Sequence, residues 1–213
     1  MKLIATHRNA DFDALASMMA AKMLYPDAMP LLPNQINPNV KAFLSIHKDV
    51  FETHLASHAD LDLVHHLIVV DTCQWERLDG VQELKNRPSL EIQLWDHHPI
   101  KGNIQTPWRV CEVVGATITL LIRRLQQERK MLTPIQATLF LLGIYEDTGN
   151  LSFPSTTAED ARAAAYLLER HADLRIASSF LRPAYGEKQK EILFRMLDLF
   201  GKTSPTMAVY VAA

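Results

Sequence analysis

The stretch HLIVVD at His66–Asp71 decides the fold. Its central residues are apolar and mostly β-branched, which is typical of a strand buried on both faces of a parallel sheet. Two other short apolar runs are also predicted strands, Lys2–Thr6 (KLIAT) earlier in the chain and Leu90–Trp95 (LEIQLW) after it. Thr106–Val110 is a further, shorter candidate. Together these runs predict a sheet whose middle is fully buried.

Longer segments with apolar residues at helical spacing lie between and after the predicted strands. We expect helices at about residues 12–25, at a short segment that ends near residue 47, and at 116–130, 134–145, 157–171 and 187–200. Strands that alternate with helices predict an α/β fold with a doubly wound, mainly parallel sheet flanked by helices. A C-terminal helical segment is expected to follow it.

The composition is that of an ordinary globular chain. The 213 residues carry a formal net charge of −2, which argues against coating nucleic acid by charge alone. No apolar run approaches the roughly 18 to 20 residues that span a bilayer, and the N-terminus does not resemble a signal peptide. Cys73 and Cys111 form no CxxC motif and are predicted to be reduced thiols. We therefore expect a cytoplasmic protein that does not associate with membranes.

Asp and His side chains follow each of the main predicted strands and end one predicted helix. Because the carboxyl ends of parallel strands meet at one edge of a sheet, these side chains are expected to lie close together. The segments are His7–Asp13 (HRNADFD), Asp71–Thr72, Asp96–His98 (DHH) and Tyr145–Gly149 (YEDTG).

Six of these side chains are candidate metal ligands: His7, Asp11, Asp13, Asp71, His97 and Asp147. Without a counter-ion the four carboxylates would repel one another and some would be protonated. Two divalent cations offset those charges, and mixed Asp and His sites suit Mn²⁺, Mg²⁺, Fe²⁺ or Co²⁺. Metals about 3.5 to 4 Å apart can bind a phosphoryl oxygen and ionise a water. The set therefore predicts hydrolysis of a phosphoester or a phosphoanhydride.

Each segment alone has a simpler interpretation. Asp near a helix start is a common N-cap, Asp after a strand is a common turn residue, and a His doublet can lie on the surface. His65-His66 is such a doublet, but it precedes a strand, and we interpret it as structural. Gly115–Thr117 is either a plain helix start or a set of N–H groups for a phosphate.

The four segments resemble the motifs of the Asp-His-His (DHH) phosphoesterase superfamily. HRNADFDALAS at residues 7–17 is similar to its first motif, Asp71 to its second, Asp96-His97-His98 to its third, and GIYEDTG at residues 143–149 to its fourth. The superfamily includes manganese-dependent inorganic pyrophosphatases, exopolyphosphatases, single-strand exonucleases, nanoRNases and cyclic-dinucleotide phosphodiesterases. The resemblance implies a parallel five-stranded sheet flanked by helices.

The resemblance also implies a role for each candidate residue. His7, Asp11 and Asp71 would bind one metal ion, whereas Asp13, Asp71, His97 and Asp147 would bind the other, so that Asp71 bridges the two. His98 and Asp96 are the candidate catalytic residues. His98 would contact the substrate phosphate, and Asp96 would fix an imidazole by a hydrogen bond. The expected cofactors are two divalent ions, Mn²⁺ first, with Mg²⁺ or Co²⁺ as alternatives.

Enzymes of this superfamily have a second, C-terminal domain, and their substrate lies between the two. We therefore expect a DHH catalytic domain at residues 1–186, followed at 187–213 by a linker helix and the truncated start of a missing second domain. Some bacterial relatives join the DHH module to CBS domains and an RNA nucleotidyltransferase of the poly(A) polymerase or CCA-adding type.

The sequence thus predicts a metal-dependent phosphoesterase domain that hydrolyses a phosphodiester with a metal-bound hydroxide. The expected substrate is a short single-stranded oligonucleotide or a small nucleotide, which suggests a part in RNA processing. One alternative is an inorganic pyrophosphatase or exopolyphosphatase. The other is a non-catalytic module that senses a nucleotide or a metal.

Overall fold

The computed structural model describes residues 1–55, 59–99, 102–181 and 191–198. The chain forms two compact units, Met1–Leu181 and Arg182–Ala213. In the second unit, residues 191–198 are helical, within the helix predicted at 187–200. The rest of that helix, the final apolar tail and the expected boundary at 186 and 187 lie outside the described residues, so this domain division stays a prediction.

The first unit is built on a parallel sheet, as predicted. All six strands are parallel, in the order β3-β2-β1-β4-β5-β6, so the sheet has one strand more than the expected five. The strands are β1 (Lys2–Ala5), β2 (Ala28–Leu32), β3 (His54–Leu55), β4 (His66–Val70), β5 (Glu91–Asp96) and β6 (Trp108–Cys111).

Strand β2 escaped the sequence analysis because Pro30 lies in its middle. Pro30 pairs with Ile4 of β1, but β3 pairs only with Leu31 and Leu32. At Pro30 the strand therefore has a neighbour on one side only, where a missing N–H is tolerated. The two-residue β3 is too short to give a pattern.

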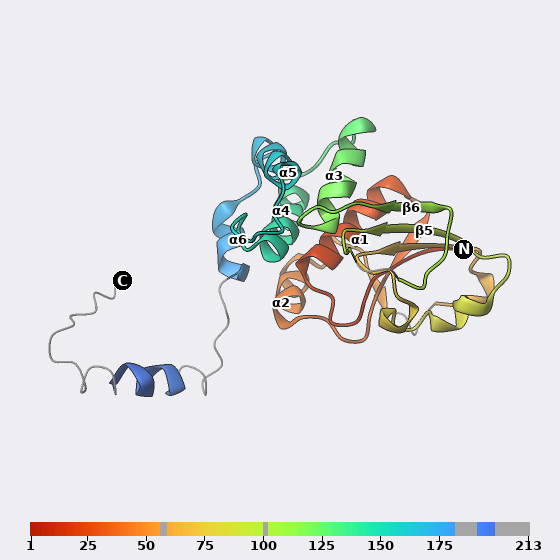
Figure 1. Ribbon diagram of the computed structural model, residues 1–213, viewed down its shortest axis with the longest axis horizontal. Coiled ribbons are helices and arrows are strands. Elements are labelled where there is room, and N and C mark those ends of the chain that lie inside the picture. The colour runs from red at the N-terminus through yellow and green to blue at the C-terminus, as the bar shows by residue number, and fades with distance from the viewer. Residues whose placement is uncertain (56–58, 100–101, 182–190, 199–213) are drawn as a thin grey trace. The chain divides into compact units, whose positions relative to one another are not determined.

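The described part of the first unit also holds six α-helices (Figure 1). They are α1 (Phe12–Leu24), α2 (Pro38–His47), α3 (Thr117–Gln127), α4 (Pro134–Thr148), α5 (Ala158–Glu169) and α6 (Leu174–Leu181). Short 3₁₀ helices lie at Leu61–Leu63, Trp75–Arg77 and Gln82–Asn86. The predicted α1 to α5 are present, and α6 was not predicted. No helix in the described part of the chain has the length and apolar character needed to cross a bilayer.

Every residue of β4 is buried, as its sequence predicted. Its alternate side chains enter two separate cores, Ile68 and Val70 on one face and Leu67 and Val69 on the other. The first core also holds buried residues of α1, α3, α4 and α5, whereas the second is closed by residues of the Trp75–Arg77 and Gln82–Asn86 segments. Burial on both faces makes β4 a rigid support for the residue that follows it.

The strand order places a topological switch point between β1 and β4. The chain leaves β1 for β2 on one side and leaves β4 for β5 on the other. In open α/β sheets the crevice at such a point, outside the carboxyl ends of the strands, is the usual ligand site. His7 follows β1 and Asp71 follows β4, so both lie at this crevice.

A glycine allows α4 to approach α1 closely. A Cβ at Gly143 would lie 3.0 Å from the Cβ of Ala16 and 3.0 Å from the backbone oxygen of Phe12. The two helices therefore meet at this residue, one turn before Asp147. This contact brings the end of α4 to the same edge as the start of α1.

Candidate metal centre

The loop after β1 delivers His7 and Asp11. Asp11 is the N-cap of α1, and its Oδ1 accepts the backbone N–H of Ala14 at 3.0 Å. The same oxygen lies 3.9 Å from Nε2 of His7. Asp11 thus fits both its structural interpretation as a cap and its predicted place beside His7.

Asp71 follows β4 with a left-handed backbone, at a φ of 60°. Its N–H donates to the backbone oxygen of Trp95 at 2.9 Å. Oδ2 of Asp71 lies 3.1 Å from Nε2 of His7, and Oδ1 accepts the hydroxyl of Thr117 at 2.8 Å. The carboxylate is therefore fixed from several sides at the switch point.

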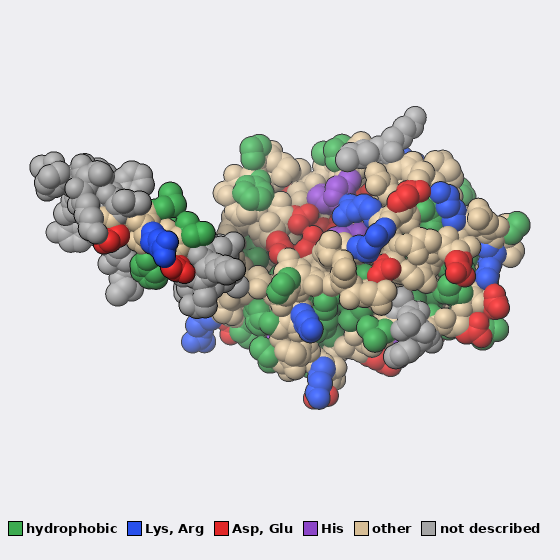
Figure 2. Space-filling model, turned by 90° about the horizontal axis from the view of Figure 1, so that it is seen from below, with side chains coloured by type: hydrophobic (Ala, Val, Ile, Leu, Met, Phe, Trp, Pro, Cys, Tyr) green, Lys and Arg blue, Asp and Glu red, His purple; other side chains and the backbone are tan. Residues whose placement is uncertain are grey.

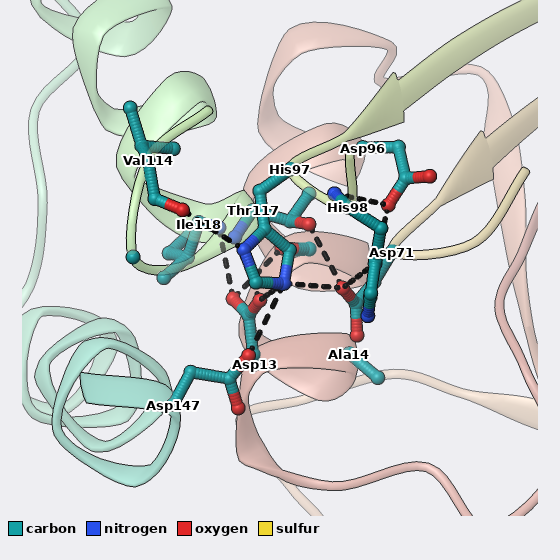
Figure 3. Close-up of polar contacts among 12 residues, drawn as sticks. Asp13, Ala14, Asp71, Asp96, His97, His98, Val114, Thr117, Ile118 and Asp147 are labelled. Atoms are coloured by element: carbon teal, nitrogen blue, oxygen red, sulfur yellow. Dashed lines mark hydrogen bonds and ion pairs between the residues drawn. The ribbon is translucent and has the colours of Figure 1, made fainter. Parts of the chain in front are cut away.

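His97 points its Nε2 into a group of carboxylates (Figure 3). Nδ1 is held by the backbone oxygen of Val114 at 3.1 Å, which favours a proton on that nitrogen. Nε2 lies 3.3 Å from Oδ2 of Asp147, 3.7 Å from Oδ1 of Asp71 and 4.0 Å from Oδ2 of Asp13. This Nε2 atom is buried and has no hydrogen-bond partner within the described residues. A buried lone pair that faces three carboxylates suits a cation placed among them.

Asp13, in the first turn of α1, is completely buried, and its carboxylate contacts the N-terminus of α3. Its two oxygens accept the backbone N–H groups of Thr117 at 2.7 Å and Ile118 at 2.8 Å. The N–H of Gly115 instead donates to Oδ2 of Asp160 at 2.8 Å. The structure therefore favours a helix start capped by carboxylates. The N–H groups of residues 115 and 117 donate to these carboxylates and are not left for a phosphate.

All six predicted ligands come together at this edge of the sheet. They form overlapping clusters in which the ligand atoms lie within 4.8 Å of one another. Ligands on opposite sides of a small divalent ion are about 4.2 Å apart, because each bond is about 2.1 Å long. The clusters thus have the dimensions of metal sites: His7, Asp11 and Asp71; Asp13, His97 and Asp147; and Asp71, His97 and His98.

Asp71 is shared between the clusters because its two oxygens face different histidines. Oδ2 faces His7, whereas Oδ1 faces His97. This is the arrangement that the predicted bridging role requires. The roles of the six residues as ligands remain a prediction that the geometry fits.

The electrostatics of the centre reflect an excess of carboxylates. Burial, followed by the charge of Asp71, raises the pKa of Asp11 to about 6 and that of Asp13 well above its ordinary value. Burial would lower the pKa of His97, but its contact with Asp147 and the charge of Asp71 outweigh this and raise it to about 9. Without metal, the raised pKa values favour protonation of Asp11, Asp13 and His97. Bound divalent cations would supply the positive charge in place of these protons.

His98 is oriented by Asp96. Oδ1 of Asp96 accepts the backbone N–H of His98 at 3.3 Å and lies 2.7 Å from its Nδ1. Asp96 is buried, whereas His98 is half-buried. The imidazole that Asp96 fixes is therefore that of His98, and its Nε2 is left for another partner.

Two acidic residues near the centre were missed by the sequence analysis. Oε2 of Glu146 accepts the N–H of Phe12 at 2.5 Å, and burial raises the pKa of Glu146 to about 7. Asp160 is buried and accepts from Gly115 and from the hydroxyl of Thr119 at 2.6 Å. The adjacency of Glu146 to Asp147 was a visible signal, but the contact of Asp160 with α3 was not.

The His65-His66 doublet lies away from this centre. His66 is the first residue of β4 and Asp71 follows the last. A five-residue strand separates its ends by about 16 Å. His66 lies 3.7 Å from Glu91 and beside the ring of Tyr25, in keeping with a structural role.

The chain belongs to the DHH family, because the family's N-terminal domain matches residues 2–144. It is 36% identical to an A-adding tRNA nucleotidyltransferase of Geobacter sulfurreducens over the whole of this chain, which spans 24% of that protein. It is also 27% identical, over 78% of its length, to a protein of Streptococcus equi subsp. equi named "probable manganese-dependent inorganic pyrophosphatase", and covers 54% of it.

A solved structure shares the fold. The exopolyphosphatase-related protein of Bacteroides fragilis superposes with a TM-score of 0.72 at 18% identity, over 98% of this chain and 62% of that one. The family and the His and Asp clusters together define a DHH phosphoesterase domain with candidate metal sites.

Proposed function

We propose that this DHH phosphoesterase domain uses two divalent cations, Mn²⁺ in the first place, to hydrolyse a phosphodiester in a short oligonucleotide or a small nucleotide. The observation that carries the proposal is the position of Asp71, whose two oxygens face His7 and His97. One carboxylate is thus available to both cations.

Each side of the centre has its own set of donors. His7 and Asp11 would hold one cation together with Asp71, and Asp13, His97 and Asp147 would hold the other. The backbone contacts of His7 with Arg8 and of His97 with Val114 orient each imidazole so that Nε2 faces the carboxylates. When bound, the cations polarise a phosphoryl oxygen and lower the pKa of a water molecule.

His98 would act on the substrate rather than on a cation. Asp96 accepts the Nδ1 proton, so that Nε2 of His98 can hydrogen-bond to a phosphate oxygen. This hydrogen bond would stabilise negative charge that develops on the phosphoryl group.

The test is manganese-dependent hydrolysis of a 5′-phosphorylated diadenylate and of bis(p-nitrophenyl) phosphate by the chain and by Asp71→Asn. Asparagine keeps the size of the side chain and tolerates a left-handed backbone. We expect activity to fall at least 100-fold in Asp71→Asn and to be unchanged in His66→Ala. Equal activity of wild type and Asp71→Asn would contradict the proposal.

Two alternatives are separated by the same assay. Hydrolysis of pyrophosphate but not of diesters would favour a pyrophosphatase, in line with the similarity to the streptococcal protein. Bound manganese without turnover of any substrate would favour a sensing module.

We also propose that the chain works as part of a longer polypeptide in the cytoplasm. Its similarity to an A-adding tRNA nucleotidyltransferase extends over its whole length but covers a quarter of that relative. A DHH domain followed by CBS and nucleotidyltransferase domains would agree with that proportion. The length and the sequence of the intact gene product would test this proposal.

A further inference from the structure

A cavity of about 520 Å³ opens beside the His7 cluster. It shares His7 and Asp11 with the candidate metal centre, and therefore adjoins the position proposed for one cation. The remaining lining residues are Arg8, Asn9, Gln35, Glu76 and Arg77.

Backbone hydrogen bonds tie the walls of this cavity to one another. The N–H of Arg8 donates to the backbone oxygen of Arg77 at 2.8 Å, and the N–H of Asn9 donates to that of Gln35 at 2.9 Å. His7 also forms an isolated β-bridge with Leu78. Three segments that are distant in sequence thus form one fixed wall.

The two arginines of the cavity lack carboxylate partners within the described residues. Arg8 donates to the backbone oxygen of Glu76, and Arg77 forms no side-chain hydrogen bond or ion pair there. The carboxylate of Glu76 is engaged elsewhere, because it accepts from Lys85 at 3.2 Å and from Asn103 at 2.7 Å. The two guanidinium charges therefore remain available.

Figure 2 shows one face of the molecule on which Lys and Arg side chains lie next to His side chains. The four carboxylates of the metal clusters would be balanced by two divalent cations. The arginines would then leave this side of the site positive, and a guanidinium pairs well with phosphate oxygens.

We infer that Arg8 and Arg77 form a subsite for a second phosphate group of the substrate, next to the phosphate that is cleaved. This inference rests on the proposed function for the place of the cleaved phosphate. The site would then accept substrates that carry two neighbouring phosphorus centres, either along a nucleotide backbone or in pyrophosphate.

The experiment compares Arg77→Ala and Arg8→Ala with Arg175→Ala, a matched control in α6 whose side chain is almost fully exposed. KM and kcat are measured with manganese for the 5′-phosphorylated diadenylate, for pyrophosphate and for bis(p-nitrophenyl) phosphate. Loss of one charged hydrogen-bond donor is expected to raise KM about tenfold for the substrates with two phosphorus centres. Bis(p-nitrophenyl) phosphate has one phosphorus, so its KM should not change.

Arg77→Lys should recover part of the effect, because lysine keeps the charge but not the fork of donors. An effect limited to diadenylate identifies the backbone of a nucleotide, and one limited to pyrophosphate identifies a phosphoanhydride. Equal KM changes for all three compounds, or none, would overturn the subsite.

Failure of the proposed function can be recognised separately. If the wild type hydrolyses none of the compounds, calorimetric binding of diadenylate and of pyrophosphate in the presence of manganese still tests the subsite. A roughly tenfold loss of affinity in Arg77→Ala, but not in Arg175→Ala, would support it, and unchanged affinity would overturn it.

Discussion

The carboxylate of Asp13 accepts the backbone N–H of Thr117 at 2.7 Å, across 104 residues of sequence. Asp13 belongs to the first turn of α1, and Thr117 is the first residue of α3. One buried side chain therefore joins two helices and also faces His97. Its removal should affect the fold and the metal centre in different ways.

Asp13→Ala should lower the free energy of unfolding of the metal-free protein by about 2 kcal/mol or more, because two buried N–H groups lose their acceptor. Asp11→Ala is a matched comparison, since it removes a half-buried helix cap that is typically worth about 1 kcal/mol. Urea denaturation in the presence of a chelator would measure both. A smaller loss for Asp13→Ala than for Asp11→Ala would contradict this account.

Asp71→Asn should abolish the binding of both manganese ions, whereas Asp13→Ala should weaken mainly one. The reason is that Asp71 contacts both histidine clusters and Asp13 contacts only that of His97. Elemental analysis after dialysis would give the metal content of each variant. Asp27→Asn changes an exposed carboxylate and serves as the control. A normal metal content in Asp71→Asn would rule out the bridging role.

The stability of the metal-free protein should fall as the pH rises from about 4 to about 9. The pKa of Asp11 is raised from 3.8 to about 6, and that of His97 from 6.5 to about 9. The folded state thus binds protons more tightly than the unfolded chain. The contribution of Asp11 to stability is complete below about pH 3.8 and is lost as the pH rises past about 6. The contribution of His97 is complete below about pH 6.5 and is lost as the pH rises past about 9.

Urea denaturation across this pH range with a chelator would reveal the trend. Saturating manganese should reverse it, because the metal competes with protons for the same atoms. Constant stability with chelator would show that these groups titrate as they do in the unfolded chain.

Glu146→Gln should stabilise the metal-free protein at pH values above 7. Burial raises the pKa of Glu146 from 4.5 to about 7, so its ionised form is unfavourable in the folded state. The amide oxygen of glutamine can still accept the N–H of Phe12. The measurement is the difference in unfolding free energy between pH 5 and pH 8, with the exposed Glu83→Gln as the control. An unchanged pH dependence would contradict the prediction.

The sequence was most informative where one residue type repeats at one structural position. β4 could be predicted because all of its residues after His66 are apolar, and Asp or His follows it and the strands beside it. These local patterns predicted the parallel sheet and all six candidate ligands. The fold adds that they are brought together at the switch point between β1 and β4.

Other features depend on contacts that no local pattern encodes. β2 contains Pro30, and β3 has only two residues. The positive wall of the cavity exists because residues near 8, 35 and 77 are joined by backbone hydrogen bonds. Such pairings follow from the topology of the sheet, so they could be seen only after the chain was folded.

Asp160 of α5 braces Gly115 and Thr119 near the start of α3, which in turn holds Asp13 and Asp71. The edge that carries the candidate metal clusters is therefore completed by a helix that comes after every strand in the sequence. The strands alone therefore do not complete the centre, because Asp147 lies on α4, and Asp13 and Asp71 are held by a helix that Asp160 supports.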